Sequence, residues 1–401
     1  MIDKVEEVLT RGVEKIYPSK EALEKVLRSG EKIRLYNGID PTGPFLHLGH
    51  MVILRKLRQF QDLGHQVILL VGDFTGMIGD PSGKSQARRP MTRKELLENA
   101  KTYKEQASKI LNFSGKNPVE IKYNSEWLGK LGLAEIMHLA SLVTYPQIIE
   151  RDMFQKRMKE GKDVFVNELF YPLMQGYDSV AMNIDLEIGG SDQTFNMLMG
   201  RTLMKKIKGK EKFVLTTPLL AIPGRGKMGK TEGNLVALTE EPNEMFGKIM
   251  SWPDGVIIPG FTLLTDVSLE DIKRMEDQLK SQKINPRDLK KRLTREIVTT
   301  LHSSKAAKEA QEEFEQVFQK GKTPMHHILI YDIKGGLKNI VDLLVETKLA
   351  FSRSEAKRLV EQGAVEIDGK VIRDTQQVIR PKEGMIIKVG KRKFLRISVN
   401  Q

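Results

Sequence analysis

Residues 33–73 read IRLYNGIDPTGPFLHLGHMVILRKLRQFQDLGHQVILLVGD. The first eight residues form a strand pattern that ends in the breaker run Asp40-Pro41-Thr42-Gly43-Pro44. Apolar residues then recur every three or four positions until Gly64, which predicts a helix, and residues 65–73 form a second strand pattern. Because β-α-β crossovers are right-handed and join parallel strands, the chain is predicted to begin with a doubly wound, Rossmann-like α/β domain with a parallel sheet.

Three more stretches have the pattern of buried strands and extend the predicted sheet: residues 119–124, 185–190 and 213–220. In an open parallel sheet, ligands bind beyond the carboxyl ends of the strands. We therefore expect the functional residues in the loops that follow these strands.

The length of 401 residues, at about 150 residues per domain, leaves room for two or three domains. Residues 244–318 carry helical patterns without strand alternation, which predicts a helical second domain. Residues 337–401 contain 14 Lys and Arg against 8 Asp and Glu, so a basic module is expected there. Within it, Ser352-Arg353-Ser354-Glu355 is a capping box that opens a helix, and Asp368-Gly369 between two short strands predicts a tight hairpin.

The composition excludes several classes of protein and site. No apolar stretch approaches the roughly 18 residues of a membrane-spanning helix, and residues 1–18 lack the apolar core of a secretory signal, so we predict a soluble, cytoplasmic protein. The absence of cysteine excludes disulfides, thiolate metal ligands and cysteine nucleophiles, and the seven histidines are too scattered for a metal cluster. The net charge of +13 attracts a polyanion such as RNA, although it would equally serve solubility.

Two histidines follow the first strand as His47-Leu48-Gly49-His50. At positions i and i+3 they share one face of the first helical turn, where free backbone amides and the positive end of the helix dipole favour a bound phosphate. Gly49 leaves the backbone exposed, so that a flat base can lie against the helix. Two histidines at this spacing are more often surface or capping residues than ligands, but their place after a strand and a breaker loop favours phosphate binding.

A glycine-rich basic loop follows the last predicted strand. Residues 224–234 read GRGKMGKTEGN, in which Lys227 and Lys230 can reach phosphate oxygens as charge develops on a leaving group. The loop is not of the GxxxxGK[ST] type, because that motif follows a first strand and opens a helix. In isolation, a solvated basic loop is the competing interpretation.

A polar face interrupts the apolar helix pattern FYPLMQGYDSVAM at residues 170–182. Tyr171, Gln175 and Asp178 stand at i, i+4 and i+7, which places them on one side of the helix. A buried polar face favours a polar ligand, and a hydrogen-bonded core network is the alternative.

The motifs H-L-G-H and K-M-G-K-T on a doubly wound sheet resemble those of the class I aminoacyl-tRNA synthetases, and within that class the bacterial tyrosyl-tRNA synthetase family, over nearly the whole chain. The resemblance implies a Rossmann-like catalytic domain at residues 1–235 with a connective insertion at about 80–165. It further implies a helical, tRNA anticodon-side domain at 236–325 and a small α+β RNA-binding module of the ribosomal-protein-four type at 337–401.

The resemblance also implies roles for individual residues. At the phosphates and the transition state it implies the catalytic residues Thr42, His47, His50, Lys227, Lys230 and Thr231. It implies ATP binding by Asp40, Gly49, Gly190, Asp192 and Lys230, with the Asp192 carboxylate on the ribose. It implies tyrosine binding by Tyr36, Asp80, Tyr171, Gln175, Asp178 and Gln193, with Tyr36 and Asp178 at the phenolic hydroxyl. Glu187 occupies a position where some family members carry glutamine.

The implied reaction is the ligation of tyrosine to tRNA in two steps. L-Tyrosine and ATP give tyrosyl-adenylate and pyrophosphate, and the tyrosyl group then passes to the terminal adenosine of tRNA(Tyr). Mg²⁺ is expected to arrive with ATP, since the sequence shows no dedicated carboxylate cage and no metal ligands are predicted. The resemblance implies a homodimer, with an interface around residues 128–160, and neither DNA nor a membrane as partner.

Other functions compete with this interpretation. A tryptophan–tRNA ligase would share the fold and the phosphate motifs, although Tyr36 with Asp178 argues against it. The H-x-G-H nucleotidyltransferases share the phosphate site but lack the lysine loop and the RNA-binding tail. A non-catalytic RNA-binding protein on the same scaffold would need lost motifs, and none are lost.

Overall fold

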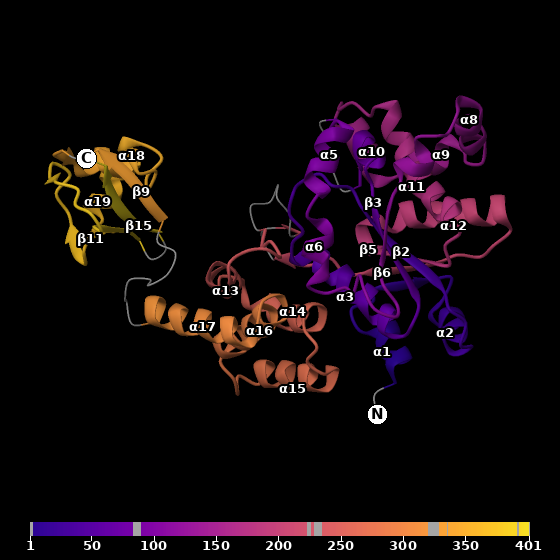
Figure 1. Ribbon diagram of the computed structural model, residues 1–401, viewed down its shortest axis with the longest axis horizontal. Helices are drawn as coiled ribbons and strands as arrows, with labels where there is room; N and C mark the ends of the chain where they lie inside the picture. The colour runs from indigo at the N-terminus through magenta and orange to yellow at the C-terminus, as the bar shows by residue number, and fades with distance from the viewer. Residues whose placement is uncertain are drawn as a thin grey trace. The chain divides into compact units, whose positions relative to one another are not determined.

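The computed structural model describes residues 3–82, 90–222, 226–227, 235–319, 329–334, 336–390 and 393–400. The chain forms two compact units, Met1–Ala307 and Lys308–Gln401, and the boundary between them in the sequence falls within one long helix (Figure 1). No helix in the described ranges is long and apolar enough to cross a membrane.

A six-stranded sheet with the order β1-β6-β5-β2-β3-β4 forms the centre of the first unit. Its strands are β1 (Lys15–Tyr17), β2 (Arg34–Ile39), β3 (Gln66–Val71), β4 (Glu120–Tyr123), β5 (Leu186–Gly190) and β6 (Phe213–Thr217). All neighbouring strands are parallel except β1 and β6. The predicted α/β fold is therefore confirmed. The observed strands β2 to β6 each lie within the range predicted for them, and β1 is the one strand of this sheet that was not predicted.

The strand order reverses between β2 and β5. From β2 the chain continues to β3 and β4 on one side, and later to β5 and β6 on the other. Right-handed crossovers in opposite directions place α3 (Leu48–Asp62) and α12 (Thr194–Lys208) on opposite faces of the sheet. The carboxyl ends of β2 and β5 therefore flank the point where open α/β sheets bind their ligands.

The other helices of this α/β part precede β2 or belong to the long connection between β3 and β5. Helix α11 (Val166–Ala181) packs closely along α12, because Gly176 and Gly200 lie where the two meet: a Cβ on Gly176 would lie 3.2 Å from the Gly200 nitrogen. The remaining helices are α1 (Lys4–Thr10), α2 (Lys20–Arg28), α4 (Thr75–Ile78), α5 (Arg93–Ala100), α6 (Tyr103–Ser108), α7 (Ser125–Leu128), α8 (Leu133–Ser141), α9 (Tyr145–Ile149) and α10 (Asp152–Lys159).

A helical region follows the sheet, as the sequence predicted. Its helices are α13 (Pro242–Met250), α14 (Ile257–Leu264), α15 (Leu269–Lys280), α16 (Pro286–Leu301) and α17 (Ser304–Gln319). The division of the first unit into a catalytic domain up to residue 235 and a helical domain from residue 236 remains a prediction.

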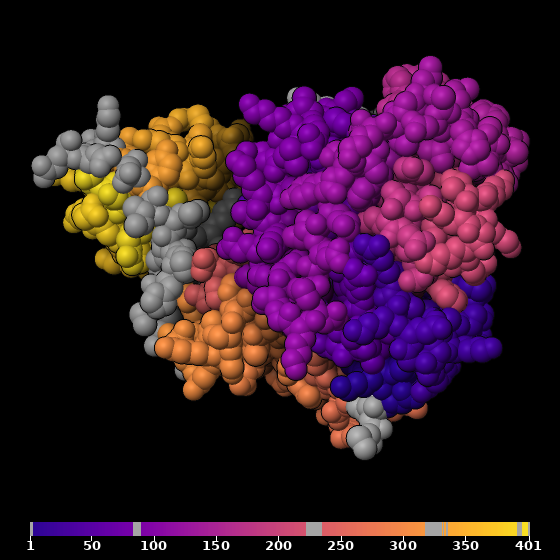
Figure 2. All heavy atoms as spheres, turned by 45° about the vertical axis from the view of Figure 1, so that its right-hand side comes forward, coloured from indigo at the N-terminus to yellow at the C-terminus, as the bar shows by residue number. Residues whose placement is uncertain are grey.

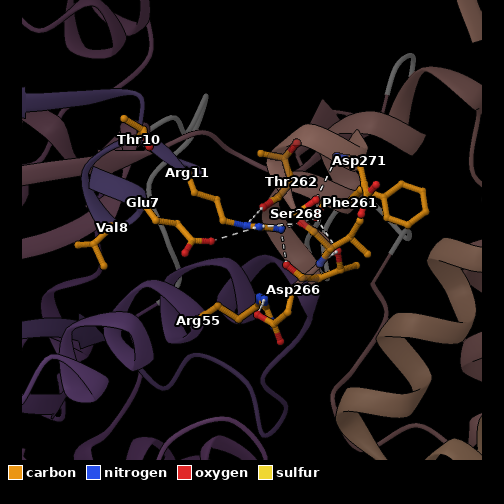
Figure 3. Close-up of polar contacts among 12 residues, drawn as sticks. Glu7, Val8, Thr10, Arg11, Arg55, Phe261, Thr262, Asp266, Ser268 and Asp271 are labelled. Atoms are coloured by element: carbon orange, nitrogen blue, oxygen red, sulfur yellow. Dashed lines mark hydrogen bonds and ion pairs between the residues drawn. The ribbon is translucent and has the colours of Figure 1, made fainter. Parts of the chain in front are cut away.

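Arg11, directly after α1, ties the helical region to the sheet domain (Figure 3). Its guanidinium is buried and satisfies carbonyl groups around the end of α14, where a helix leaves its last carbonyls without partners. These acceptors are the carbonyl oxygens of Phe261 (3.3 Å), Thr262 (3.2 Å), Thr265 (2.6 Å) and Val267 (2.8 Å). Arg55 of α3 adds an ion pair to Asp266 at 2.5 Å. Helix α3, which follows His47, is therefore held to the helical region by Arg55 near the middle of the helix.

The second unit contains a five-stranded sheet with the order β12-β11-β14-β15-β9 and two helices that share its apolar core. Its elements are β9 (Leu329–Lys334), β10 (Lys338–Asn339), α18 (Ile340–Glu346), α19 (Arg353–Glu361), β11 (Val365–Ile367), β12 (Lys370–Ile372), β13 (Val378–Ile379), β14 (Ile386–Val389) and β15 (Lys393–Asn400). Ser352 caps α19 by accepting from the Glu355 nitrogen, as predicted. Asp368 and Gly369 have φ of 47° and 81° and form the predicted tight turn between β11 and β12.

Candidate active site

Asp40 follows β2 and connects three elements. Its Oδ1 accepts a hydrogen bond of 2.6 Å from Thr75 Oγ1 at the start of α4, and its Oδ2 accepts one of 2.9 Å from the Tyr171 hydroxyl on α11. A side chain at Gly72 would collide with this carboxylate, because a Cβ there would lie 2.0 Å from Asp40 Oδ1. The end of β2 is thus fixed to both neighbouring segments of the site.

His47 and His50 form a reciprocal cap at the start of α3, with their ring centroids 3.9 Å apart. His47 Nδ1 accepts from the Gly49 nitrogen at 3.1 Å, and His50 Nδ1 accepts from the His47 nitrogen at 3.2 Å. Because each Nδ1 is an acceptor, the neutral rings carry their proton on Nε2, which becomes the donor. Burial, together with the adjacent His47 ring, lowers the pKa of His50 well below its usual range.

The capping arrangement corrects one expectation from the sequence. The amides of the first turn of α3 are not free: the Gly49 amide donates to His47, and the Leu48 amide donates to the carbonyl of Val236 at 3.0 Å. The competing interpretation of the pair as a helix cap is therefore correct. It is compatible with phosphate binding, since the caps use Nδ1 and the donors are Nε2.

The chain that leaves the lysine loop returns to the two histidines. His47 forms an isolated antiparallel bridge with Ala237, and the Leu238 nitrogen donates to the Leu46 carbonyl at 2.9 Å. At the start of the loop, β7 (Ala221–Ile222) pairs with β8 (Gly226–Lys227). Lys230 and Thr231 lie outside the described residues, and only the backbone of Lys227 is described.

Asp178 and Tyr36 lie in the interior of the site. Asp178 Oδ1 accepts from Trp127 Nε1 at 2.7 Å, and Oδ2 accepts from Asn124 Nδ2 at 3.2 Å. Burial raises the pKa of Asp178 well above its usual range, and the two hydrogen bonds oppose this rise. Tyr36 is fully buried, its hydroxyl lies 3.1 Å from Ser179 Oγ, and burial together with Glu187 and Asp178 raises its pKa.

Asn124 links this interior pair to the end of β2. Its Nδ2 also donates to Thr75 Oγ1 at 2.9 Å, and Thr75 in turn donates to Asp40. A continuous chain of hydrogen bonds therefore runs from Asp178 through Asn124 and Thr75 to Asp40. Asp40 lies in the loop that leads to His47.

The polar face of α11 exists as predicted, but its three side chains have different partners. Tyr171 donates to Asp40, Gln175 Nε2 donates to Glu187 Oε1 at 3.0 Å, and Asp178 accepts from Trp127 and Asn124. The face is therefore part of a hydrogen-bonded network, which the sequence offered as the alternative to a ligand pocket.

Asp80 and Gln193 are held together beside the network. Gln193 Nε2 donates to Asp80 Oδ2 at 2.8 Å, and Asn196 Nδ2 contacts both Gln193 Oε1 at 3.0 Å and Asp80 Oδ1 at 3.4 Å. Gly190 ends β5, and Asp192 is half-buried in the 3-10 turn Ser191–Gln193 that follows. Thr42 is exposed and Gly49 half-buried. Within the described ranges, no group of three or more His, Asp or Glu side chains could hold a metal ion.

Several residues of this network were absent from the sequence-based site, among them Trp127, Ser179 and Lys212. Lys212 is fully buried and forms an ion pair with Glu187, and its Nζ donates to Ser179 Oγ at 2.8 Å. A sequence signal existed for this pair, because Glu187 stands inside the buried strand LEIGG and a carboxylate there requires a cationic or hydrogen-bonding partner.

Comparisons with known proteins match nearly the whole chain, and they agree on one family. The family described as tRNA synthetases class I (W and Y) matches residues 28–319, and the family described as tyrosine–tRNA ligase SYY-like C-terminal domain matches residues 313–397. A tyrosine–tRNA ligase of Thermotoga maritima is 47% identical over 98% of this chain and 96% of its own length. One of Carboxydothermus hydrogenoformans is 46% identical over 98% of this chain and 97% of its own length.

Among solved structures, a C-terminally truncated mitochondrial tyrosyl-tRNA synthetase of Aspergillus nidulans has the same fold. It matches with a TM-score of 0.66 and 23% identity, over 79% of this chain and 94% of its own length.

Proposed function

Since this chain belongs to the class I tRNA synthetases of the tryptophan and tyrosine group, we propose that the network around β2 and β5 holds the two substrates of amino-acid activation on opposite sides of Asp40. The chain functions as a tyrosine–tRNA ligase, and ATP is one of its substrates. The chain of hydrogen bonds from Asp178 to Asp40 carries the proposal, because it fixes the two sides relative to each other.

On the tyrosine side, the Asp178 carboxylate accepts a hydrogen bond from the phenolic hydroxyl of the substrate, and Tyr36 lies at the same hydroxyl. Phenylalanine would leave this buried acceptor without a partner, which disfavours its binding. Tyr171, Gln175 and Asp80 lie toward the α-amino group, and Gln193 faces the carboxylate. Asp80 already accepts from Gln193, so the two act as one unit.

On the ATP side, the Nε2 groups of His47 and His50 donate to phosphate oxygens. The lowered pKa of His50 keeps its ring neutral near pH 7, so it acts as a hydrogen-bond donor rather than a cation. Asp192 accepts from the ribose hydroxyls, Gly49 and Gly190 let the nucleotide approach the backbone, and Asp40 and Thr42 complete this side. Lys227, Lys230 and Thr231 act on the phosphates, and Mg²⁺ enters with ATP as part of the substrate.

The chemistry is positioning and charge stabilisation, with no protein nucleophile. A carboxylate oxygen of tyrosine attacks the α-phosphorus in line, the bond to the bridging oxygen breaks, and pyrophosphate leaves with the electron pair. In the second step a ribose hydroxyl of the terminal adenosine of tRNA(Tyr) attacks the tyrosyl carbonyl, and AMP leaves.

We assign tRNA binding to the second unit. Lys357 and Arg358 lie exposed on α19 while Ala356 and Val360 face the core, so the helix presents a basic side to solvent. Such a face contacts phosphates and RNA shape more than base edges. We place the reaction in the cytoplasm, where translation occurs in bacteria.

We also propose that the enzyme is a homodimer. Leu133, Met137 and Tyr145 on α8 and α9 are 76%, 59% and 64% exposed, and Phe165 and Val166 at the start of α11 are 52% and 69% exposed. Figure 2 brings the side with α8 and α9 forward. An exposed apolar surface of this kind is typical of a protein interface, and a second copy of the chain is the occupant we propose.

ATP–pyrophosphate exchange tests the assignment of the site. We expect exchange with tyrosine and little with phenylalanine or tryptophan, and we expect Asp178→Asn to remove most of the preference for tyrosine over phenylalanine. If tyrosine discrimination survived this substitution, Asp178 would not be at the phenolic hydroxyl.

A further inference from the structure

An ammonium group is buried behind the proposed tyrosine site. The side chains of Lys212 and Glu187 are 0% and 3% exposed. The three N–H groups of Lys212 have three acceptors: the Glu187 carboxylate, Ser179 Oγ at 2.8 Å and the Met197 carbonyl at 3.2 Å. Apolar residues of similar volume often give equal or greater stability than such a pair, because two charges lose their hydration. Stability is therefore a weak explanation for it.

Helix α12 leaves room for the ammonium. A Cβ on Gly200 would lie 2.4 Å from Lys212 Nζ and 2.8 Å from Ser179 Oγ. Any larger residue at this position would displace the lysine or the serine. The absence of a side chain at Gly200 thus makes room for the Lys212 ammonium group between α12 and its neighbours.

Lys212 is linked to two residues of the proposed tyrosine site, Tyr36 and Gln175, through one intermediate residue each. Tyr36 and Glu187 are paired on the neighbouring strands β2 and β5, and the Tyr36 hydroxyl lies 3.1 Å from Ser179 Oγ. Gln175 donates to Glu187 Oε1, the oxygen that Lys212 does not bind. The ion pair therefore reaches Tyr36 through Ser179 and Gln175 through Glu187.

The hydrogen atoms of this network have a preferred direction. Lys212 can only donate, so Ser179 Oγ accepts from it and has one proton left to donate. The nearer acceptor for that proton is the Tyr36 oxygen at 3.1 Å, since Glu187 Oε2 lies at 3.4 Å and already accepts from Lys212. With its oxygen accepting from Ser179, Tyr36 keeps its own proton for another acceptor, either the Glu187 carboxylate or an oxygen of a bound ligand.

We propose that Lys212 is a positioning residue for tyrosine selection, which acts through Ser179 to make Tyr36 the donor to the phenolic oxygen while Asp178 accepts the phenolic proton. This inference rests on the proposed placement of tyrosine between Tyr36 and Asp178. It adds that the discrimination between tyrosine and phenylalanine depends on a charge that does not touch the substrate.

Two variants test the proposal. Ser179→Ala keeps the Lys212–Glu187 ion pair, but it breaks the link to Tyr36 and removes one of the three acceptors of Lys212. Lys212→Met with Glu187→Gln removes both charges without leaving one of them unpaired. For each we expect kcat/KM for tyrosine in pyrophosphate exchange to fall about tenfold, the loss of one buried hydrogen bond, through a higher KM. The values for phenylalanine and the KM for ATP should change by less than about twofold, so the tyrosine preference falls about tenfold.

Lys56→Met is the matched control, since Lys56 is also buried, on α3, and donates to the carbonyls of Val8 and Arg11 rather than to the site. We expect a lower melting temperature and an unchanged preference for tyrosine. An unchanged preference in Ser179→Ala and in the double variant, or equal losses for both amino acids, would overturn the role of Lys212. Failure of the proposed placement itself is distinguishable, because Asp178→Asn would then leave discrimination intact as well.

Discussion

His47 and Ala237 lie side by side as an isolated antiparallel bridge, so the residue that caps α3 is paired with the chain that leaves the lysine loop. Two further backbone bonds, Leu48 to Val236 and Leu238 to Leu46, fix this arrangement. Residues 236–238, which follow the lysine loop in the sequence, are therefore held beside the start of α3 by backbone bonds.

Replacing Lys230 by Ala should separate catalysis from tyrosine binding. If the lysine loop stabilises charge on the leaving pyrophosphate, tyrosine-dependent exchange should fall by about 10²–10³-fold while the Kd for tyrosine remains within about twofold. Stopped-flow measurement of adenylate formation and equilibrium dialysis with tyrosine provide the two values. Equal losses in both would show that the loop has a structural role.

Trp127→Phe should shift the pH dependence of tyrosine activation. The indole donates to Asp178 at 2.7 Å, a bond that stabilises the carboxylate and opposes the rise of its pKa on burial. Without the bond the pKa of Asp178 rises further. Tyrosine activation needs the ionised carboxylate as acceptor, so when the pH is lowered kcat/KM for tyrosine begins to fall at a higher pH than in the unaltered enzyme. We expect a loss of about tenfold at neutral pH and a profile displaced to higher pH.

The matched control is Trp252→Phe, the same substitution at a buried indole of the helical region. It should leave the profile in place. A Trp127→Phe profile that coincides with that of the unaltered enzyme would mean that the ionisation of Asp178 does not limit tyrosine activation.

The sequence predicted the sheet well because its strands are apolar runs that end in breakers. β2 ends just before Asp40-Pro41, and β5 ends in Gly189-Gly190, so pattern and fold coincide. β1 was missed because KIY offers three residues without alternation, and only pairing with β6 makes it a strand.

The site was only partly predictable, since its polar interior depends on contacts between distant segments. Lys212 stands in KGKEKF, which has the composition of a solvated turn, and nothing local shows that its side chain reaches Glu187 and Ser179. Trp127 likewise gives no local signal that its indole serves Asp178. By contrast, the spacing of Tyr171, Gln175 and Asp178 encoded their common face directly.

Charges introduced on α8 should dissociate the proposed dimer. Leu133→Glu combined with Met137→Glu places two carboxylates on a surface that is apolar and exposed in the single chain. Burying them would cost several kcal/mol, so the mass measured by light scattering should fall from that of a dimer to that of one chain. Leu269→Glu, at an exposed leucine of α15, is the control and should leave the mass unchanged. A monomeric mass for the unaltered protein would contradict the dimer.

Lys56 should make the stability of the first unit rise with pH. Burial, with a smaller contribution from Arg11, lowers the pKa of Lys56 to about 7. An unfolded lysine has a pKa of about 10.4. Between these two values the unfolded chain binds more protons than the folded one, so the free energy of unfolding increases with pH, by up to about 1.4 kcal/mol per pH unit. The neutral amine retains two N–H donors, which match the two carbonyls of Val8 and Arg11 at 2.8 and 2.6 Å.

The measurement compares urea unfolding of the unaltered chain and Lys56→Met at pH 7, 8 and 9. The tryptophan fluorescence reports on the first unit, because Trp127 and Trp252 are the two tryptophans of the chain. We expect the difference in unfolding free energy to widen with pH, and Lys4→Met, at an exposed lysine of α1, to show no such trend. A difference that stays constant from pH 7 to 9 would mean that Lys56 keeps its charge in the folded protein, and that its two carbonyl partners compensate for the burial of an ammonium ion.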